Sequence, residues 1–205
     1  MIEIKPDDAT RERYVQNIIN VFQSAAESQE THGRWWYVTA HDTASMMADG
    51  DVRTGAGLLA ALSPQTSWWL NIRLACDAYE SGDPRGHVGD ALSKAARILA
   101  GTDPADVLPM ARKTGMFYRL ILDPYDPEAV CVDRHAHDVA VGEVYGSRDR
   151  GLSAEGRYAL IAHCYREAAM RLGELPSVVQ AVCWVVWRDR LAGTSTRGDS
   201  FNREV

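Results

Sequence analysis

Apolar residues recur at helical spacing along almost the whole chain, and this pattern limits the fold more than any other feature of the sequence. In the first such segment, Tyr14, Ile18 and Val21 fall on one face of a helix. No segment shows the alternation of apolar and polar residues that a half-buried strand requires, and the chain contains no internal repeat and no heptads. We therefore predict an all-α protein of about nine helices, in which residues 129–132 form one short extended piece.

Segments rich in Gly, Pro, Asp and Ser are expected to separate these helices. The expected helices cover residues 6–29, 35–48, 55–62, 68–79, 90–100, 153–171 and 177–191, and further helices lie in the central stretch 108–142. Residues 30–33, which end in Gly33, are expected to interrupt the first two helices. The last helix is apolar nearly all round, so we expect it to be mostly buried.

The length and composition fit a globular protein. A chain of 205 residues suits one domain of two lobes or two small domains, and 24% charged residues are ordinary for this class. No apolar run approaches the ~18 residues of a membrane span, so no membrane partner is expected. The first residues are polar and lack the apolar core of a signal peptide, which favours a cytoplasmic protein.

The cysteines are expected to be buried, reduced thiols. Cys76, Cys131, Cys164 and Cys183 are widely spaced and lie in apolar helical segments. The sequence contains no Cys-x-x-Cys pair and no Cys/His cluster of the kind that binds zinc or an iron–sulfur cluster. We therefore predict no metal and no other cofactor.

The net charge of −6 weighs against a nucleic-acid-binding protein, because such proteins rely on contacts between Lys or Arg and phosphates. A local basic strip can coexist with an acidic exterior. Arg112, Lys113, Arg119 and Arg134 are the candidates for such a strip. A solvated face of mixed charge is the alternative interpretation of the same residues.

The central stretch 108–142 concentrates the residue types that carry chemistry. Asp133 ends the apolar run 129–132 and is followed at once by Arg134 and His135. An aspartate in this position can cap the next helix, where its carboxylate accepts hydrogen bonds from the backbone N–H groups of the first turn. Alternatively, it serves as a half-buried carboxylate in catalysis, with Lys113 brought near it by the intervening turn. The spacing alone leaves both interpretations open.

The segment from Lys113 to Asp133 resembles the core of the helix-hairpin-helix DNA glycosylase superfamily. Leu108-Pro109 and Arg112-Lys113-Thr114 match the hairpin of that superfamily, and Val132-Asp133-Arg134-His135 matches its acid motif. The chain departs from the pattern at Met110-Ala111, which stand where the hairpin has Gly-x-Gly. In the superfamily, the glycines let the backbone N–H groups of this loop approach a DNA phosphate closely. The replacement of these glycines therefore bears on phosphate binding by the loop.

A second match lies in the turn Leu62-Ser63-Pro64-Gln65-Thr66. In the superfamily the first core helix ends in a similar turn, whose Gln enters the DNA stack when a base is flipped out; Gln65 matches that position. The alternative is a helix stop in which Ser63 or Thr66 caps the next helix. Trp68 and Asn71 follow on one helical face, where they either recognise a base by stacking and hydrogen bonding or simply pack.

The resemblance implies a helical fold of two lobes within one domain of residues 1–205. The central lobe would cover residues 52–150, and residues 1–51 and 151–205 would form the second, with the pocket between them. The resemblance further implies a DNA glycosylase-like enzyme that acts on a flipped-out, modified base in DNA. Asp133 and Lys113 would be catalytic, and the expected substrate-binding residues are Gln65, Trp68, Asn71, Tyr118, Arg134 and His135.

The layout of motifs is also similar to glycosylase-like proteins of actinobacteria and their phages, which implies a bacterial or phage-infected cytosol. The superfamily includes phage enzymes that do not excise bases but transfer amino acids or polyamines onto activated 5-hydroxymethyluracil in DNA. Such a transferase is one alternative function. The others are an enzyme that acts on free nucleotides or another small ligand, and a non-catalytic helical binding protein.

Overall fold

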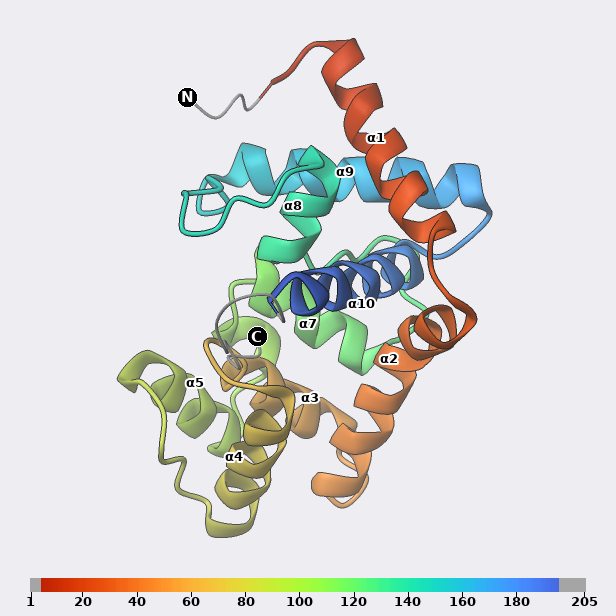
Figure 1. Cartoon of the computed structure of the whole chain (residues 1–205). Helices are drawn as coiled ribbons and strands as arrows, with labels where there is room; N and C mark the ends of the chain where they lie inside the picture. The colour runs from red at the N-terminus through yellow and green to blue at the C-terminus, as the bar shows by residue number, and fades with distance from the viewer. Residues whose placement is uncertain (1–4, 196–205) are drawn as a thin grey trace. The chain divides into compact units, whose positions relative to one another are not determined.

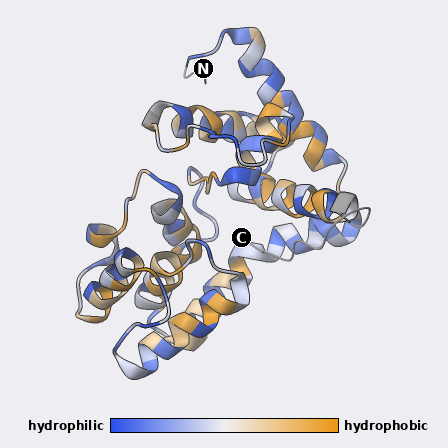
Figure 2. Cartoon of the chain, turned by 60° about the vertical axis from the view of Figure 1, so that its left-hand side comes forward, coloured by the Kyte–Doolittle hydropathy of each residue, from blue (hydrophilic) through white to orange (hydrophobic). Residues whose placement is uncertain are grey.

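A computed structural model describes residues 5–195, and all regular structure within that range is helical, which confirms the all-α prediction. The helices are α1 (Asp8–Gln23), α2 (Glu27–Met47), α3 (Val52–Ala61), α4 (Trp68–Ser81), α5 (Gly89–Leu99), α6 (Pro104–Val107), α7 (Lys113–Leu122), α8 (Arg134–Val141), α9 (Glu155–Leu172) and α10 (Pro176–Ser195) (Figure 1). Figure 2 shows apolar and hydrophilic residues sharing individual helices, as amphipathic helices require.

The described residues form two compact units. The end unit contains residues 5–36 and 125–195, and the central unit contains residues 37–124. The divisions therefore fall within α2 and just after α7, rather than near residues 52 and 150 as the sequence analysis expected. The reason is packing: α8 contacts α1, α9 and α10, whereas the last turns of α2 join the central unit, where Tyr79 donates a hydrogen bond to the carbonyl of Ala48.

The predicted interruption at residues 30–33 is wrong, because α2 runs through them without a break. A Cβ atom on Gly33 would lie 2.5 Å from the Cα atom of Val182 in α10. Glycine at position 33 therefore permits a close approach of two helix backbones within the end unit. Its value there is the absence of a side chain and not the flexibility that ends helices.

The end unit is built on mutual contacts among α1, α8, α9 and α10 (Figure 1). Its centre holds fully buried side chains from three of these helices, namely Ile18, Ile161, Tyr165 and Val182. Most of α10 is buried, in agreement with the prediction from its apolar composition. Burial of each such side chain contributes about 1.5–3 kcal/mol of hydrophobic free energy.

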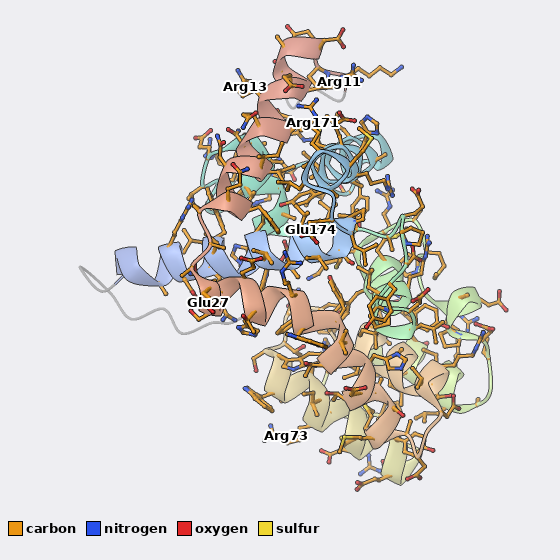
Figure 3. All side chains as sticks on the ribbon, turned by 90° about the vertical axis from the view of Figure 1, so that its right-hand side faces the viewer. Arg11, Arg13, Glu27, Arg73, Arg171 and Glu174 are labelled. Atoms are coloured by element: carbon orange, nitrogen blue, oxygen red, sulfur yellow. The ribbon has the colours of Figure 1, made fainter. Side chains whose placement is uncertain are left out.

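Two bidentate ion pairs join the helices at the surface of the end unit. Arg171 of α9 donates two hydrogen bonds to Glu12 of α1, at 2.6 and 2.8 Å. Arg34 of α2 donates two to Glu174, at 3.0 and 2.7 Å. Figure 3 labels Arg171 and Glu174 at the two sites. Because these groups are exposed to solvent, which screens their charges, the pairs contribute little to stability and mainly fix how the segments sit within this unit.

The central unit is organised around α3, which contacts α4, α5, α6 and α7. All α3 residues from Gly55 to Ala61 are buried. The glycine at position 57 lets the helix approach its neighbours closely, since a Cβ atom there would lie 2.7 Å from Pro104. Small residues on α3 thus set the short distances at the core of this unit.

The segment that resembles a glycosylase hairpin packs tightly on the first turn of α7. A Cβ atom on Gly115 would lie 2.6 Å from the carbonyl oxygen of Pro109 and still closer to the backbone of Met110. The loop lacks the expected hairpin glycines, and here the glycine lies on the helix that the loop touches. The absence of a side chain at Gly115 therefore allows the loop to pack closely against α7.

Replacement of Gly115 by alanine is expected to destabilise the protein. Alanine normally stabilises a helix relative to glycine, by about 1 kcal/mol, but the clash with the loop backbone requires a shift that costs about 1–3 kcal/mol. Urea unfolding measures the difference. The matched control is Gly89→Ala in α5, where a Cβ atom meets nothing within 4 Å, so this variant should be as stable as the wild type or more so. Equal stability of the two variants would contradict the packing described above.

Candidate functional site

Asp133 follows a buried, non-helical segment, residues 129–132, where the sequence predicted a short extended piece. The hydroxyl group of Tyr158 in α9 donates a hydrogen bond to the carbonyl of Val130 and accepts one from the backbone N–H of Val132, both at 3.0 Å. Burial of this phenol raises its pKa, so it stays protonated and keeps both hydrogen bonds. The segment that leads into α8 is therefore held in place from α9.

Asp133 is the N-cap of α8. Its Oδ1 atom accepts a hydrogen bond of 2.8 Å from the backbone N–H of Ala136, as the capping interpretation predicted. Its side chain is only partly buried, and no described residue donates a hydrogen bond to its second carboxylate oxygen. Capping and chemistry are therefore compatible, because one oxygen anchors the group and the other is available to a ligand.

His135 lies in the first turn of α8, two residues after Asp133. Its Nε2 atom accepts a hydrogen bond of 3.2 Å from the Arg134 guanidinium, which can only donate, so the imidazole proton lies on Nδ1. Burial lowers the pKa of His135, and the charge of Asp133 partly opposes this effect. The histidine is therefore neutral at neutral pH.

Aromatic and basic side chains adjoin His135 within the end unit. The ring of Trp184 in α10 meets the His135 ring edge-on, with centroids 6.5 Å apart. Trp184 also packs on Trp36, at 5.2 Å, and the Arg188 guanidinium lies 4.5 Å from its ring centroid. We call Asp133, Arg134, His135, Trp184 and Arg188 the Asp133 cluster.

The part of this cluster that comes from α10 was not predicted from the sequence. The signal was the spacing of Trp184 and Arg188, four residues apart on a helix otherwise expected to be apolar all round. Both side chains are intermediate in exposure, unlike most of α10. An aromatic ring and a guanidinium one turn apart on a buried helix thus marked the face that meets α8.

The other predicted catalytic residue belongs to the central unit. Lys113 is the first residue of α7 and is partly exposed. Tyr118 lies on the same helix and is buried, and burial raises the pKa of its phenol. Since Asp133 belongs to the end unit, the pairing of Lys113 with Asp133 stays a prediction from the sequence.

The turn that contains Gln65 is tightly braced. The hydroxyl of Ser63 donates to the carbonyl of Ala60 at 3.0 Å, and that of Thr66 donates to the carbonyl of Leu62 at 3.0 Å. Both residues thus satisfy carbonyl groups at the end of α3, and the interpretation that one of them caps the next helix is wrong. Ser67 caps α4 instead.

Gln65 itself is exposed and has a φ of 62°, in the left-handed region that residues other than glycine rarely adopt. The braces from Ser63 and Thr66 therefore hold a strained residue at the tip of the turn. Such strain is enriched at ligand-contacting positions, which fits the predicted role of Gln65.

Trp68 and Asn71 face the interior of the central unit. The side-chain amide of Asn71 donates a hydrogen bond of 3.0 Å to the carbonyl of Leu59, and the ring of Trp68 meets Phe117 edge-on at 6.4 Å. These contacts match the packing interpretation of the pair. They tie α4 to α3 and α7.

A buried ionic network on the other face of α8 was not predicted at all. Asp138 accepts two hydrogen bonds of 2.7 Å from Arg150 and one of 3.0 Å from the backbone N–H of Tyr145. His137 bonds Asp138 through Nδ1, at 2.9 Å, and its Nε2 atom accepts from Arg157 at 3.0 Å. Asp138 thereby fixes the loop between α8 and α9 to the core of the end unit.

The protonation states follow from these contacts. Burial alone would raise the pKa of Asp138, but hydrogen bonds from His137 and Arg150 outweigh it and hold the pKa at about 2. Burial also lowers the pKa of His137, which the hydrogen bond with Asp138 only partly offsets. The network therefore contains a neutral imidazole between an ionised carboxylate and a guanidinium.

Stability is expected to fall as the pH is lowered. His135 and His137 have folded pKa values below the usual 6.5, so below that pH the unfolded chain binds protons that the folded chain does not. Asp138 contributes a further loss of about 2 kcal/mol as the pH falls from about 4 to 2. Urea unfolding at pH 7.5 and 5.5 tests the histidine contribution. His137→Gln should reduce this pH dependence, and a variant with the same pH dependence as the wild type would contradict the contribution of His137.

Three of the cysteines, Cys131, Cys164 and Cys183, are buried thiols, and Cys76 is partly exposed. Among residues 5–195, no group of three His, Cys, Asp or Glu side chains could hold a metal ion. In the same range, no helix is long and apolar enough to cross a membrane.

The sequence matches a protein family over residues 1–191, which is nearly its whole length. No curated protein and no solved structure matches the chain. The chain therefore belongs to that family, which is described as a family of unknown function (DUF7178).

Proposed function

We propose that this protein is a DNA base-directed enzyme, similar to DNA glycosylases, that acts on a flipped-out, modified base. The observation that carries the proposal is the position of Asp133. It is anchored through one carboxylate oxygen at the N-terminus of α8, and it presents the other at a partly exposed site beside His135 and Arg134.

A carboxylate held in this way suits the chemistry of base excision. Positive charge develops on the deoxyribose as the bond to the base breaks, and a fixed negative charge stabilises it without further reorganisation. The cap to Ala136 and the brace from Tyr158 supply the fixed position. The same carboxylate can activate a nucleophile, which a transferase also requires.

The surroundings of Asp133 support DNA as the partner. Arg134 and Arg188 place two guanidinium groups in the Asp133 cluster, although the chain as a whole has a net charge of −6. Guanidinium groups bind phosphate, and the partly exposed ring of Trp184 offers an apolar surface to a base. The strained, exposed Gln65 supports a contact with DNA from the central unit.

Lys113 is the proposed nucleophile, in keeping with its match to the hairpin motif. A lysine amine that attacks the sugar C1′ atom displaces the base, which leaves with a proton. Cleavage of the C1′–O4′ bond then opens the sugar ring and gives a Schiff base, which borohydride reduces to a stable covalent adduct. Wild-type protein incubated with DNA that carries oxidised or hydroxymethylated pyrimidines should therefore be trapped by borohydride. Lys113→Ala should abolish the adduct, whereas Lys94→Ala, a lysine of α5 in the same unit, should not.

The outcome also separates the proposal from the transferase alternative. A transferase that modifies activated 5-hydroxymethyluracil keeps the glycosidic bond, so it forms a longer side chain on the base and no borohydride adduct. A new base in the DNA digest without an adduct would favour the transferase. A base-directed function would be contradicted if none of these substrates gave an adduct, a released base or a new base.

A further inference from the structure

The first two turns of α4 carry an exposed aromatic and basic pair. Trp69 is 75% exposed, and Arg73 follows it by four residues, which places both on one face of the helix. Figure 3 shows the labelled Arg73 pointing away from the α4 ribbon. No described residue forms a hydrogen bond, an ion pair or a ring contact with either side chain.

The exposure of Trp69 does not come from a loose helix. Its neighbours Trp68 and Asn71 anchor α4 inward through Phe117 and the carbonyl of Leu59, and Ser67 caps the helix. The helix is therefore fixed within the central unit, and the indole of Trp69 is held on its outer face. A single exposed apolar residue is common on protein surfaces, but a rigid indole beside an unengaged guanidinium is a specific combination.

We infer that Trp69 and Arg73 bind an unpaired nucleotide, with the base stacked on the indole and its phosphate bound by the guanidinium. The inference rests on the proposed function in that nucleic acid is taken as the partner. Aromatic rings bind single-stranded nucleic acid because every base has a face that can stack, and Arg supplies the charge that the phosphate requires.

The flanking residues favour a nucleotide over a protein partner. Protein interfaces centre on a Trp or Arg that is surrounded by further contacts which exclude water. Around Trp69 the exposed flanking residues are polar: Gln65 precedes the helix, and Arg73 and Asp77 follow along it. The carboxylate of Asp77, one turn beyond Arg73, repels a further phosphate, so the site fits a short unpaired stretch and not an extended strand.

The test measures binding by the full chain with a short fluorescein-labelled single strand and with a perfect duplex of the same sequence. Fluorescence anisotropy should show tighter binding to the single strand. Trp69→Ala should weaken that binding on the order of tenfold, and Trp69→Phe, which keeps an aromatic face, should retain most of it. Arg73→Gln should lower the salt dependence of the affinity by about one phosphate contact.

Two matched variants serve as controls. Trp35→Ala removes another exposed indole, and Arg97→Gln removes another exposed charge of the central unit, and both should bind as the wild type does. Unchanged affinity of Trp69→Ala, or no binding of the wild type to single strands even at low salt, would overturn the inference.

The result is separable from that of the proposed function. If product formation depends on Asp133 but the Trp69→Ala variant binds normally, the proposed enzymatic function stands and the proposed stacking site is wrong. If binding depends on Trp69 but no base-directed product forms, the stacking site stands and the proposed enzymatic function is wrong.

Discussion

Replacement of Asp138 by asparagine is expected to destabilise the protein by on the order of 3–5 kcal/mol, which is the usual result when one partner of a buried ion pair is removed. The side chains of Asp138 and Arg150 are only 3% and 14% exposed. Asparagine has nearly the same size and keeps an acceptor for the backbone N–H of Tyr145. It loses the charge that compensates the buried guanidinium, so the destabilisation reports the ionic network itself.

The same loop offers a matched control for Asp138→Asn. Glu143 pairs with Arg148 at the surface, where the two side chains are 57% and 53% exposed. Glu143→Gln should therefore change the free energy of unfolding by less than about 1 kcal/mol. Urea unfolding at neutral pH compares the two variants. Similar small losses in both would show that Asp138 does not hold the loop between α8 and α9.

The second large effect is expected at Asp133. Asp133→Asn should lower the rate of the base-directed reaction by on the order of 10²–10³, the typical loss when a preorganised electrostatic group is removed. Stability should hardly change, because asparagine is nearly as good an N-cap as aspartate. Thermal unfolding should therefore show a melting temperature close to that of the wild type, together with unchanged DNA affinity or a modest gain.

The control for Asp133→Asn is the same substitution at another N-cap. Asp7 caps α1 by accepting a hydrogen bond of 2.7 Å from the backbone N–H of Thr10. Asp7→Asn should leave both stability and activity as in the wild type. A loss of activity in both variants would point to a general effect on the fold, and a large drop in melting temperature for Asp133→Asn alone would assign Asp133 a structural role.

Local patterns were sufficient to predict much of the fold. Apolar spacing identified the all-α class and the burial of α10, because helix formation and the burial of one helical face depend on residues three or four apart. The same local logic gave the N-cap as one of the two interpretations of Asp133, since the capped N–H belongs to Ala136, three residues further on.

Features that depend on distant residues were missed. Gly33 was expected to end a helix, but its role is set by Val182 in α10, and no local pattern contains that information. Asp138 reaches Arg150 only because the intervening loop turns back on α8. Asn71 was equally able to face a ligand or the core until the position of Leu59 was known.

The candidate site was predicted in part for the same reason. Asp133, Arg134 and His135 are adjacent in sequence, so the helix that begins after Asp133 brings them together. Trp184 and Arg188 join them from α10 through tertiary packing, which the spacing of the sequence motifs did not reveal. The pairing of Asp133 with Lys113 depends on residues of different units and awaits the trapping experiment.

The most direct test of the role of Asp133 is a single-turnover rate measured side by side for the wild type and Asp133→Asn. The substrate is duplex DNA with one oxidised or hydroxymethylated pyrimidine, and the readout is the released or modified base. We expect product from the wild type and a rate lower by on the order of 10²–10³ for the variant at equal DNA occupancy. Equal rates for the two proteins would contradict the assignment of Asp133 as the catalytic carboxylate.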